Sequence, residues 1–375
     1  MNTSREVVVV GGGVVGAALT YYLAKSGARV TLMERDAPGA GVSGASFGYI
    51  NAARKRPGHY HRLSRLGVEA YDALEEELGP DSGLGPRGAL LWPEPGSLCG
   101  KKINALVEEL RQLRYPFELL TPDEAAEVEP GIRVAGVDNS ILYLPYERWV
   151  EGDLLAAALV SRAGDYGAKV MAPCSVRKVL HHSGSVDGVS MSEGSMPADT
   201  VIVAAGTGSV GLLAPLGYHL PLGRVVGVLG LTSPWPGLLR GTAYPGIYHV
   251  RPTHEGRIVI GAHEVDRLAD EHTDVSTPPS WADRLLQMAQ LDMPGLESLR
   301  LEEVRLGVRP MPADGLPIIG RVPHVEGVYV AVMHSGITLA SIVGQALSTE
   351  VVTNERPTFL EPYLPDRAFP SKTKT

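Results

Sequence analysis

Hydrophobic residues open the chain in a pattern that changes from strand to helix and back. Val7 to Val10 are four β-branched residues in a row, which is typical of a strand buried on both faces of a parallel sheet. Small and apolar residues then recur at helical spacing from Val14 to Lys25, and a second strand is predicted from Arg29 to Met33. The pattern predicts a strand–helix–strand unit with a right-handed crossover.

The middle of the chain alternates predicted helices with short predicted strands. One amphipathic helix carries Leu63 to Leu78 and ends at Gly79–Pro80, and another carries the apolar residues from Ile103 to Leu113. Thr121 to Glu124 reads TPDE, which is typical of a capping box. A further helix is expected over Leu154 to Ala163, followed by strands over Ala168 to Met171, Ser175 to Leu180, Val186 to Met191 and Thr200 to Ala204.

Between Gly217 and Arg309 the sequence contains many prolines and only short predicted strands, of which IYHV and RIVIG are the clearest. This stretch predicts a second domain rich in antiparallel strands. The chain then returns to an apolar strand from Val328 to Val332 and a helix from about Ile337 to Val352. The first domain is therefore expected to be built from segments far apart in the sequence.

Length and charge narrow the classes of function. The chain has 375 residues, which exceeds the usual size of a single core, and its net charge of -8 offers no basic footprint for nucleic acid. The two cysteines, Cys99 and Cys174, are too few for a disulfide scaffold or a thiolate cluster. The histidines, His181–His182 among them, lack metal-ligand spacing, so we expect no metal.

The start of the chain could imitate a secretory signal, because Arg5 precedes the apolar run from Val7 to Leu19. Three consecutive glycines interrupt that run, and no small-residue cleavage site follows at the right distance. No other stretch stays apolar for the roughly 18 residues that a membrane span requires. We expect a cytoplasmic protein without a membrane segment.

A glycine-rich turn joins the first predicted strand to the first helix. Gly11, Gly13 and Gly16 form the pattern G-x-G-x-x-G, and Glu34 ends the second strand about twenty residues further on. The glycines permit a tight turn, a close approach of the backbone to a pyrophosphate and close helix packing, while the helix N-terminus attracts phosphate. Glu34 can accept hydrogen bonds from ribose hydroxyls. The order of these parts predicts a dinucleotide site for NAD or FAD.

Four later segments carry a family resemblance: SGASFGYIN (Ser43 to Asn51), DTVIVAAGTGS (Asp199 to Ser209), GVRPMPADGLPIIG (Gly307 to Gly320) and HSGITLA (His334 to Ala340). In that order, they resemble four features of one superfamily: the flavin loop, the second FAD-binding turn, the GxRPxxxDGxPxIG signature and the start of the last helix. This superfamily contains the FAD-dependent D-amino-acid oxidases, glycine oxidases and sarcosine oxidases. The first is especially similar to the ASFAN-type segment of D-amino-acid dehydrogenases. The resemblance covers nearly the whole chain.

This resemblance implies an α/β fold with a Rossmann-type FAD-binding domain and an α+β substrate domain on an antiparallel sheet, similar to glutathione-reductase-2-like folds. We expect the FAD-binding domain to combine residues 1–80, 147–215 and 310–375, and the substrate domain to combine residues 81–146 and 216–309. Sarcosine-oxidase-like relatives bond the flavin to a cysteine near the GxRP position. This chain has Gly307–Val308 there, which predicts noncovalent FAD.

The resemblance also assigns the cofactor-binding residues. Small residues at Ala204 to Gly206 let the backbone lie against the cofactor, and the N–H groups that open the last helix would face the flavin, where negative charge builds on reduction. The expected FAD-binding residues are Gly11, Gly13, Val14, Val15, Gly16, Glu34, Arg35, Ser43, Ala45, Ser46, Phe47, Gly48, Val176, Ala205, Gly206, Arg309, Gly336, Ile337, Thr338 and Leu339.

Three residues are candidates for the substrate side. Arg309 is the arginine of GxRP, which binds the substrate carboxylate in the family, and a guanidinium matches a carboxylate with two parallel donors. Tyr248 and His249 lie on a predicted strand where only one can face the pocket, and the family favours Tyr248. His334 lies at the turn beside the flavin, either against substrate or flavin or as a capping residue. His334–Ser335–Gly336 replaces the His-Gly-Gly turn of many relatives.

The expected function is FAD-dependent oxidation of a small amine or amino acid. Hydride transfer from Cα to flavin N5 would give an imine that water hydrolyses, with oxygen or an electron carrier as acceptor. The alternatives are oxidation of a 2-hydroxy acid or polyamine derivative, a flavin-bound interaction protein without turnover, and an NAD-linked dehydrogenase. Substrate chirality stays open, and a homo-oligomer is compatible with the sequence.

Overall fold

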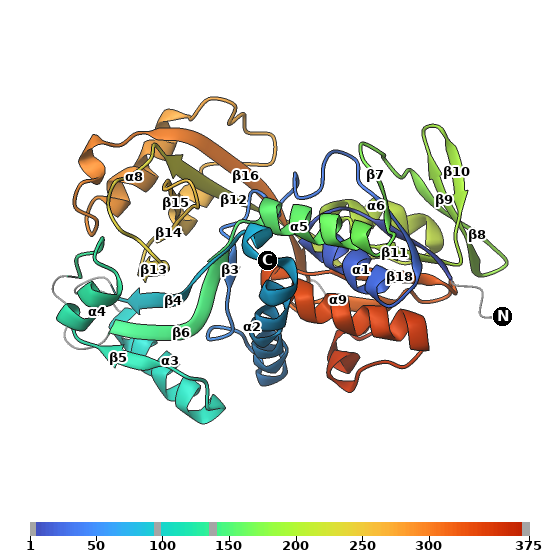
Figure 1. Ribbon diagram of the computed structural model, residues 1–375, viewed down its shortest axis with the longest axis horizontal. Helices are drawn as coiled ribbons and strands as arrows, with labels where there is room; N and C mark the ends of the chain where they lie inside the picture. Colours follow the sequence, from blue (N-terminus) through green and yellow to red (C-terminus); the bar gives the residue numbers. More distant parts are fainter. Residues whose placement is uncertain (1–4, 94–98, 135–140, 370–375) are drawn as a thin grey trace.

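The computed structural model describes residues 5–93, 99–134 and 141–369. Its strands form two large sheets and one small sheet (Figure 1). The first large sheet has six strands, in the order β17 (Ile318–Arg321), β18 (Val328–Val332), β11 (Thr200–Val203), β1 (Glu6–Val10), β2 (Arg29–Met33) and β7 (Lys169–Met171). All its pairs are parallel except β17 with β18, so the predicted strand–helix–strand unit is confirmed.

Helices cover one face of the six-stranded sheet. Val7 and Val9 of β1 point into the same core as α1 (Val14–Lys25), α5 (Gly152–Asp165) and α9 (Gly336–Thr353). Val8 and Val10 point to the opposite face, where they pack with the three-stranded sheet of β8 (Lys178–His182), β9 (Ser185–Met191) and β10 (Gly194–Pro197). Because both faces are covered, β1 needs apolar residues at every position after Glu6.

The second large sheet lies on the left of Figure 1 and contains nine strands. Its order is β16 (Leu301–Pro312), β12 (Leu222–Thr232), β15 (Ile258–Gly261), β14 (His249–Pro252), β13 (Thr242–Pro245), β4 (Leu84–Trp92), β6 (Ile141–Val150) and β3 (Tyr49–Ile50), with β5 (Glu118–Leu120) beside β6. The expected antiparallel character is confirmed for every pair except β13 with β4, which is parallel.

The remaining helices lie around the two large sheets. They are α2 (Gly58–Leu78), α3 (Cys99–Leu113), α4 (Pro122–Val128), α6 (Ser209–Leu213), α7 (His263–Asp266) and α8 (Asp283–Ala289). The predicted capping box is present at α4, because Thr121 and Glu124 each bond the other's backbone N–H. Helices α2 and α9 pack together below the junction between the sheets (Figure 1).

Two strand predictions differ from the structure at their starts. The strand predicted from Ser175 begins at Lys178, and the strand predicted from IYHV begins at His249. Strands β3, at residues 49–50, and β6 (Ile141–Val150) both lie in the nine-stranded sheet. The domain boundaries expected near residues 80 and 147 stay a prediction. Long strands β12 and β16 pair along their length in that sheet and extend toward the six-stranded one (Figure 1), and β16 contains Arg309.

Candidate active site

The turn after β1 depends on two glycines. Gly11 has φ +105°, and a Cβ there would lie 2.7 Å from the carbonyl oxygen of Ala204. A Cβ on Gly16 would lie 1.9 Å from the carbonyl oxygen of Gly11. A larger residue at either position would force the turn away from β11, so the glycine pattern serves the tight turn and close packing expected of it.

Helix α1 begins without a capping side chain from its own N-cap residue, Gly13. The N–H of Val14 donates to Ser43 Oγ at 3.1 Å, which fixes the start of the loop at Ser43 beside the helix N-terminus. A Cβ on Gly13 would lie 3.1 Å from the same hydroxyl. The N-terminus of α1 is thus open to an anion, and only a small residue fits beside it.

Glu34 lies beside the glycine turn at the end of β2. Its carboxylate accepts hydrogen bonds from the N–H of Gly12 at 2.6 Å and from the N–H of Asp36 at 2.9 Å. Arg35 points outward and forms an exposed ion pair with Asp36 at 3.1 Å. The structure therefore places Glu34 next to the glycines and Arg35 at the surface.

The segment that carries Val176 lies beside the end of β2, where Glu34 follows. The N–H of Cys174 donates to the carbonyl oxygen of Glu34 at 2.6 Å. Val176 is half-buried and lies in the link before β8 rather than within a strand. The link that carries Val176 is thus anchored at Glu34 through Cys174.

The loop from Ala45 to Gly48 lies against strand β16. A Cβ on Gly307 would lie 3.2 Å from the Cβ of Ala45, so the backbones pass closely there. Gly48 has φ +76°, and its N–H donates to Ser46 Oγ at 3.1 Å. The loop lies at the junction between the two large sheets. It contacts β16 at Gly307, which is two residues before Arg309 on the same strand.

The start of α9 meets both the start of α1 and this loop. A Cβ on Gly336 would lie 3.2 Å from Cγ2 of Val15. Thr338 Oγ1 accepts from the N–H of Asn51 and donates to the carbonyl oxygen of Tyr49, each at 3.2 Å. The carbonyl oxygen of Ile337 accepts from the buried Tyr71 hydroxyl. The first and last cofactor segments of the sequence are therefore adjacent, as predicted.

These residues fit an extended dinucleotide such as FAD. The starts of α1 and α9 lie next to each other, neither N-cap residue caps its helix with its own side chain, and glycines occupy the points where a Cβ would collide. Residues Gly13 to Gly16 would hold the diphosphate and Glu34 a ribose, while the Ala45–Gly48 loop and the start of α9 would border the ring system.

Arg309 lines a cavity of about 600 Å³ together with His263 and Asp266. Its Nη2 donates to the carbonyl oxygen of Val226 at 2.7 Å and to Asp266 Oδ2 at 3.0 Å. Its Nε is buried and makes no hydrogen bond within the described chain. A buried donor without a partner is costly. Arg309 also lines the pocket, so the exposed part of its side chain can meet a ligand.

Tyr248 does not reach this site, contrary to the expectation that it would face the pocket. Its hydroxyl donates to Asp292 Oδ2 at 2.9 Å, and its ring is buried in the core of the second large sheet. The alternation of side chains along β14 turns His249 to the other face, where its ring centre lies 4.4 Å from that of Phe47. His249 also stacks on Tyr244 at 5.3 Å.

Two histidines of the site, His249 and His334, are neutral near pH 7. Burial, with His263 and Arg54 nearby, lowers the pKa of His249 to about 3. Burial, with Lys55 and Arg309 nearby, lowers the pKa of His334 to about 4. Their rings are thus available as neutral hydrogen-bonding groups among cations.

Lys55 adds a cation that the sequence reading missed. Its Nζ donates to Ser335 Oγ at 2.7 Å, and the hydroxyl of Tyr60 donates to the same oxygen at 2.9 Å. Burial lowers the pKa of Lys55 to about 8, so its ammonium group is still mostly charged at pH 7. The run ARKR at residues 53–56, directly after the flavin-loop segment, was the available signal.

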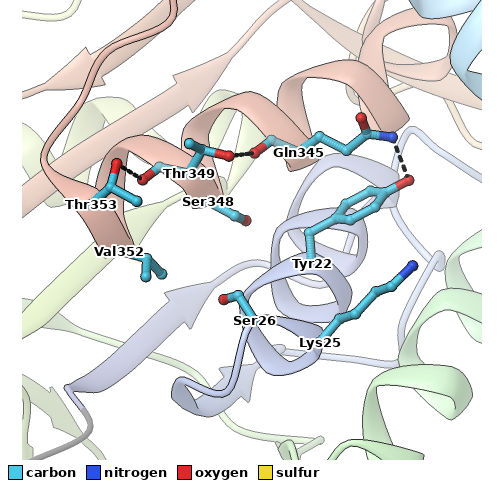
Figure 2. Close-up of a pocket in the computed structure, with 8 residues that line it drawn as sticks. All are labelled: Tyr22, Lys25, Ser26, Gln345, Ser348, Thr349, Val352 and Thr353. Atoms are coloured by element: carbon cyan, nitrogen blue, oxygen red, sulfur yellow. Dashed lines mark hydrogen bonds between the residues drawn. The ribbon is translucent and has the colours of Figure 1, made fainter. Parts of the chain in front are cut away.

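A second pocket lies away from this site, between the C-terminal halves of α1 and α9 (Figure 2). Tyr22, Gln345 and Ser348 line it, and Gln345 Nε2 donates to the Tyr22 hydroxyl at 3.0 Å. It contains none of the expected site residues. Across the residues with described positions, no cluster of three or more His, Cys, Asp or Glu side chains could hold a metal ion, and no helix is long and apolar enough to span a bilayer.

Similar proteins include glycine oxidases and D-amino acid dehydrogenases. A glycine oxidase of Pseudomonas aeruginosa is 30% identical over 90% of this chain and 92% of its own length, and a D-amino acid dehydrogenase of Xylella fastidiosa is 27% identical over 92% and 91%. The crystal structure of glycine oxidase from Geobacillus kaustophilus superposes with a TM-score of 0.86 at 27% identity, covering 98% of this chain and 100% of that one.

The family assignment follows from a match that spans most of the molecule. The model of the DAO family, described as FAD dependent oxidoreductase, matches residues 6–349. That range contains the glycine turn, Glu34, the flavin loop, Arg309 and the start of α9. The chain belongs to the DAO family of FAD-dependent oxidoreductases.

Proposed function

We propose that this protein oxidises the C–N bond of a small amino acid, using noncovalently bound FAD. The observation that carries the proposal is the position of Arg309, whose buried Nε has no partner, on the strand that passes the Ala45 loop at Gly307. A cation beside the predicted flavin loop favours a substrate with a carboxylate. The names of the glycine oxidase and D-amino acid dehydrogenase relatives agree with an amino acid substrate.

The bound flavin would supply the acceptor for a hydride from the substrate Cα, and the product imine would hydrolyse in water. The chain's own task is to bind and orient the substrate. Arg309 would hold the carboxylate from one side, while Phe47, Tyr244 and His249 form an aromatic wall that excludes water. No strong protein base is required when the amine binds in its neutral form.

Noncovalent attachment is part of the proposal. Strand β16 has Gly307 and Val308 where some relatives carry the cysteine that bonds the flavin. Cys174 is half-buried beside Met191, at 3.4 Å between the sulfurs, and its neighbour in the fold is the end of β2 that carries Glu34. It thus lies at the expected adenosine end of the groove. Acid precipitation that released yellow FAD into solution would support this part.

Arg309→Ala tests the carboxylate role. Removing one member of a buried charge pair costs about 2–5 kcal/mol, so kcat/KM on the best amino acid should fall by roughly 30- to 5000-fold. Arg300→Ala is a matched control, because Arg300 precedes the same strand and pairs only with Glu302 at an exposed site. The measurement is steady-state kinetics at equal flavin content. A wild-type kcat/KM for Arg309→Ala would show that Arg309 does not bind the substrate carboxylate.

Reduction of the flavin in the absence of oxygen distinguishes the competing functions. If 2-hydroxy acids or polyamine derivatives bleach the flavin and amino acids do not, the substrate belongs to that alternative class. Absence of bleaching by every compound would favour a flavin-bound protein without turnover. A colourless purified protein that binds NAD would contradict FAD use altogether.

We further propose that oxygen or an electron carrier reoxidises the flavin and that the enzyme acts in the cytoplasm, where it can form a homo-oligomer. Comparing reoxidation of the reduced protein by air-saturated buffer and by a quinone identifies the acceptor. Size-exclusion chromatography with light scattering measures the oligomeric state.

A further inference from the structure

Arg251 of β14 is a buried cation that the proposed reaction does not use. Only 2% of its surface is exposed, and it forms no ion pair within 4.0 Å with a carboxylate of the described chain. Burial lowers the pKa of Arg251 to about 10, although Glu151 and Asp153 act against this shift from further away. The side chain is therefore charged at pH 7. A buried cation is costly unless it is well bonded, so its partners indicate its role.

The partners of Arg251 are main-chain carbonyl groups and aromatic rings. Its Nε donates to the carbonyl oxygen of Phe47, and its Nη1 donates to that of Pro252 at 2.8 Å. Its guanidinium carbon lies 5.9 Å from the ring centre of Phe47 and 5.2 Å from that of Trp149. Arg251 thus holds Phe47 both by a charge-assisted hydrogen bond and by its ring.

Strand β14 contacts Phe47 at a second point. Residues two apart on a strand project from the same face, so His249 and Arg251 both face the loop. The ring centres of His249 and Phe47 lie 4.4 Å apart, and those of Tyr244 and Phe47 lie 5.7 Å apart. Arg251 therefore fixes one member of the aromatic wall, Phe47, against the other two.

A second arginine of the nine-stranded sheet holds the residue before the Ala45–Gly48 loop. Arg305 of β16 donates from Nη1 to the carbonyl oxygen of Gly44 at 3.1 Å, and 30% of its side chain is exposed. Ser43, one residue earlier, instead accepts from the N–H of Val14 at the start of α1. The segment is thus tied to α1 at its first residue and to the nine-stranded sheet further along.

We propose that Arg251 is a positioning residue for the flavin ring: it fixes the Ala45–Gly48 loop to the nine-stranded sheet, with Arg305 as a weaker, more exposed support. The proposal rests on the use of FAD proposed above. The predicted diphosphate end has its own contact, between Val14 and Ser43. Loss of Arg251 should therefore loosen the ring end of the site and leave the diphosphate end intact.

Arg251→Met tests this difference with two ligands. Methionine is unbranched but has neither the charge nor the donors, and ADP contains the adenosine and diphosphate of FAD without its ring. The dissociation constant for FAD should rise by about 10- to 100-fold, because the loop must be ordered without its charge-assisted bond. The constant for ADP should stay within about twofold. Calorimetric titration of the full-length apoprotein measures both. Equal weakening of FAD and ADP, or unchanged FAD binding, would overturn the proposal.

Two further variants separate the hydrogen bond from packing. Arg251→Lys keeps the charge and a donor, so it should bind FAD more tightly than Arg251→Met. Arg305→Met should weaken FAD by only about 3- to 10-fold, because its site is partly exposed, and should spare ADP. A lysine variant that bound FAD no better than Arg251→Met would show that the bond to Phe47 does not position the loop, and would contradict the proposal.

Arg356→Met is the matched control. Arg356 is also largely buried and donates to main-chain carbonyl oxygens, those of Ile319 at 3.0 Å and Leu360 at 2.6 Å, which lie outside the loop. This variant should leave the ratio of the FAD and ADP constants unchanged even if its stability falls. An equal change of that ratio in Arg356→Met and Arg251→Met would mean that loss of any buried arginine has this effect, and the assignment of Arg251 would be wrong.

The flavin-loaded enzyme gives a second readout. The visible absorption of a flavin depends on the surroundings of its ring, so the spectrum of Arg251→Met should differ from that of wild type and the spectrum of Arg356→Met should not. A wild-type protein that binds ADP but no FAD contradicts the proposed function. A wild-type protein that binds FAD and is reduced by an amino acid, with Arg251→Met identical to it in FAD affinity and spectrum, contradicts the role of Arg251 only.

Discussion

At the scale of single residues, the site combines neutral histidines with nearby cations. His249 lies among Phe47, Tyr244 and His263, and its neutral form follows from burial and from positive neighbours. A buried group whose pKa differs between the folded and unfolded chain makes stability depend on pH. The same surroundings that suit a substrate carboxylate therefore cost the folded protein stability in acid.

His249→Gln tests this cost. The pKa of His249 is about 3 in the folded chain and about 6.5 in the unfolded chain. Between pH 3 and pH 6.5, His249 is therefore protonated in the unfolded chain and neutral in the folded chain. Wild type should lose stability as the pH falls from 6.5 toward 3, and the variant should lose about 2–3 kcal/mol less between pH 7 and 4.5. Urea midpoints at the two pH values measure it. Parallel losses in both proteins would show that His249 makes no such contribution.

The proximity of the predicted cofactor segments followed from the sequence, whereas the positions of the substrate-side residues followed only in part. Gly11, Gly16 and Glu34 have a fixed local spacing that encodes backbone geometry, and the structure brings them together. Tyr248 was misplaced because a strand shows which residues alternate but not which face meets the site. Lys55 and Asp266 join the site only through long-range packing, which no local pattern records.

At the scale of elements, α1 and α9 set the geometry of the groove. Their starts meet at Val15 and Gly336, and along their length Gly344 of α9 lies against α1. A Cβ on Gly344 would lie 2.8 Å from Cδ2 of Tyr22 and 3.0 Å from the Cβ of Ala18. The distance between the two helices, and therefore the position of both N-termini, depends on this glycine.

Gly344→Ala should separate the two helices. We expect a loss of about 1–3 kcal/mol in the free energy of unfolding, because an added methyl group must displace packed atoms. Gly164→Ala is the control, since that glycine lies in α5, nothing approaches its Cβ position within 4 Å, and alanine favours helix by up to about 1 kcal/mol. Denaturant unfolding compares the two. An unaltered stability for Gly344→Ala would mean that α9 moves aside without cost.

Element types were easier to predict than element partners. Helices α1, α2 and α9 and strands β1, β2 and β18 lie where the apolar periodicity placed them, within a residue or a few. The parallel pairing of β13 with β4 was not foreseen, because these strands are separated by a long stretch of sequence and pairing direction is set by the connection rather than by composition.

At the scale of the whole molecule, the fold joins two large sheets, and the predicted cofactor segments lie where the sheets meet. The six-stranded sheet presents the carboxyl ends of β1, β2 and β11, and the nine-stranded sheet supplies Arg309 and the aromatic wall. A cofactor lying between them would contact segments from the first and the last parts of the described chain. Its binding energy then adds to the stability of the entire fold.

Removal of FAD should lower thermal stability. Free FAD at a hundred times its dissociation constant stabilises the folded state by about 2.7 kcal/mol, so the unfolding temperature should rise by several degrees as FAD is added back to the apoprotein. Differential scanning fluorimetry over an FAD series measures it, with NAD at equal concentration as the comparison. A rise with NAD and none with FAD would contradict the assignment of the cofactor.

The order of strands in the six-stranded sheet has a consequence for biosynthesis. Strand β11 pairs with β1 on one side and with β18 on the other, and α9 follows directly after β18. A ribosome that has not yet released Val328 has made the diphosphate turn but leaves one edge of β11 bare and the ring-binding helix unmade. The two segments predicted to border the coenzyme are therefore made at different times, and the nascent chain must protect the bare edge of β11 until β18 has been made.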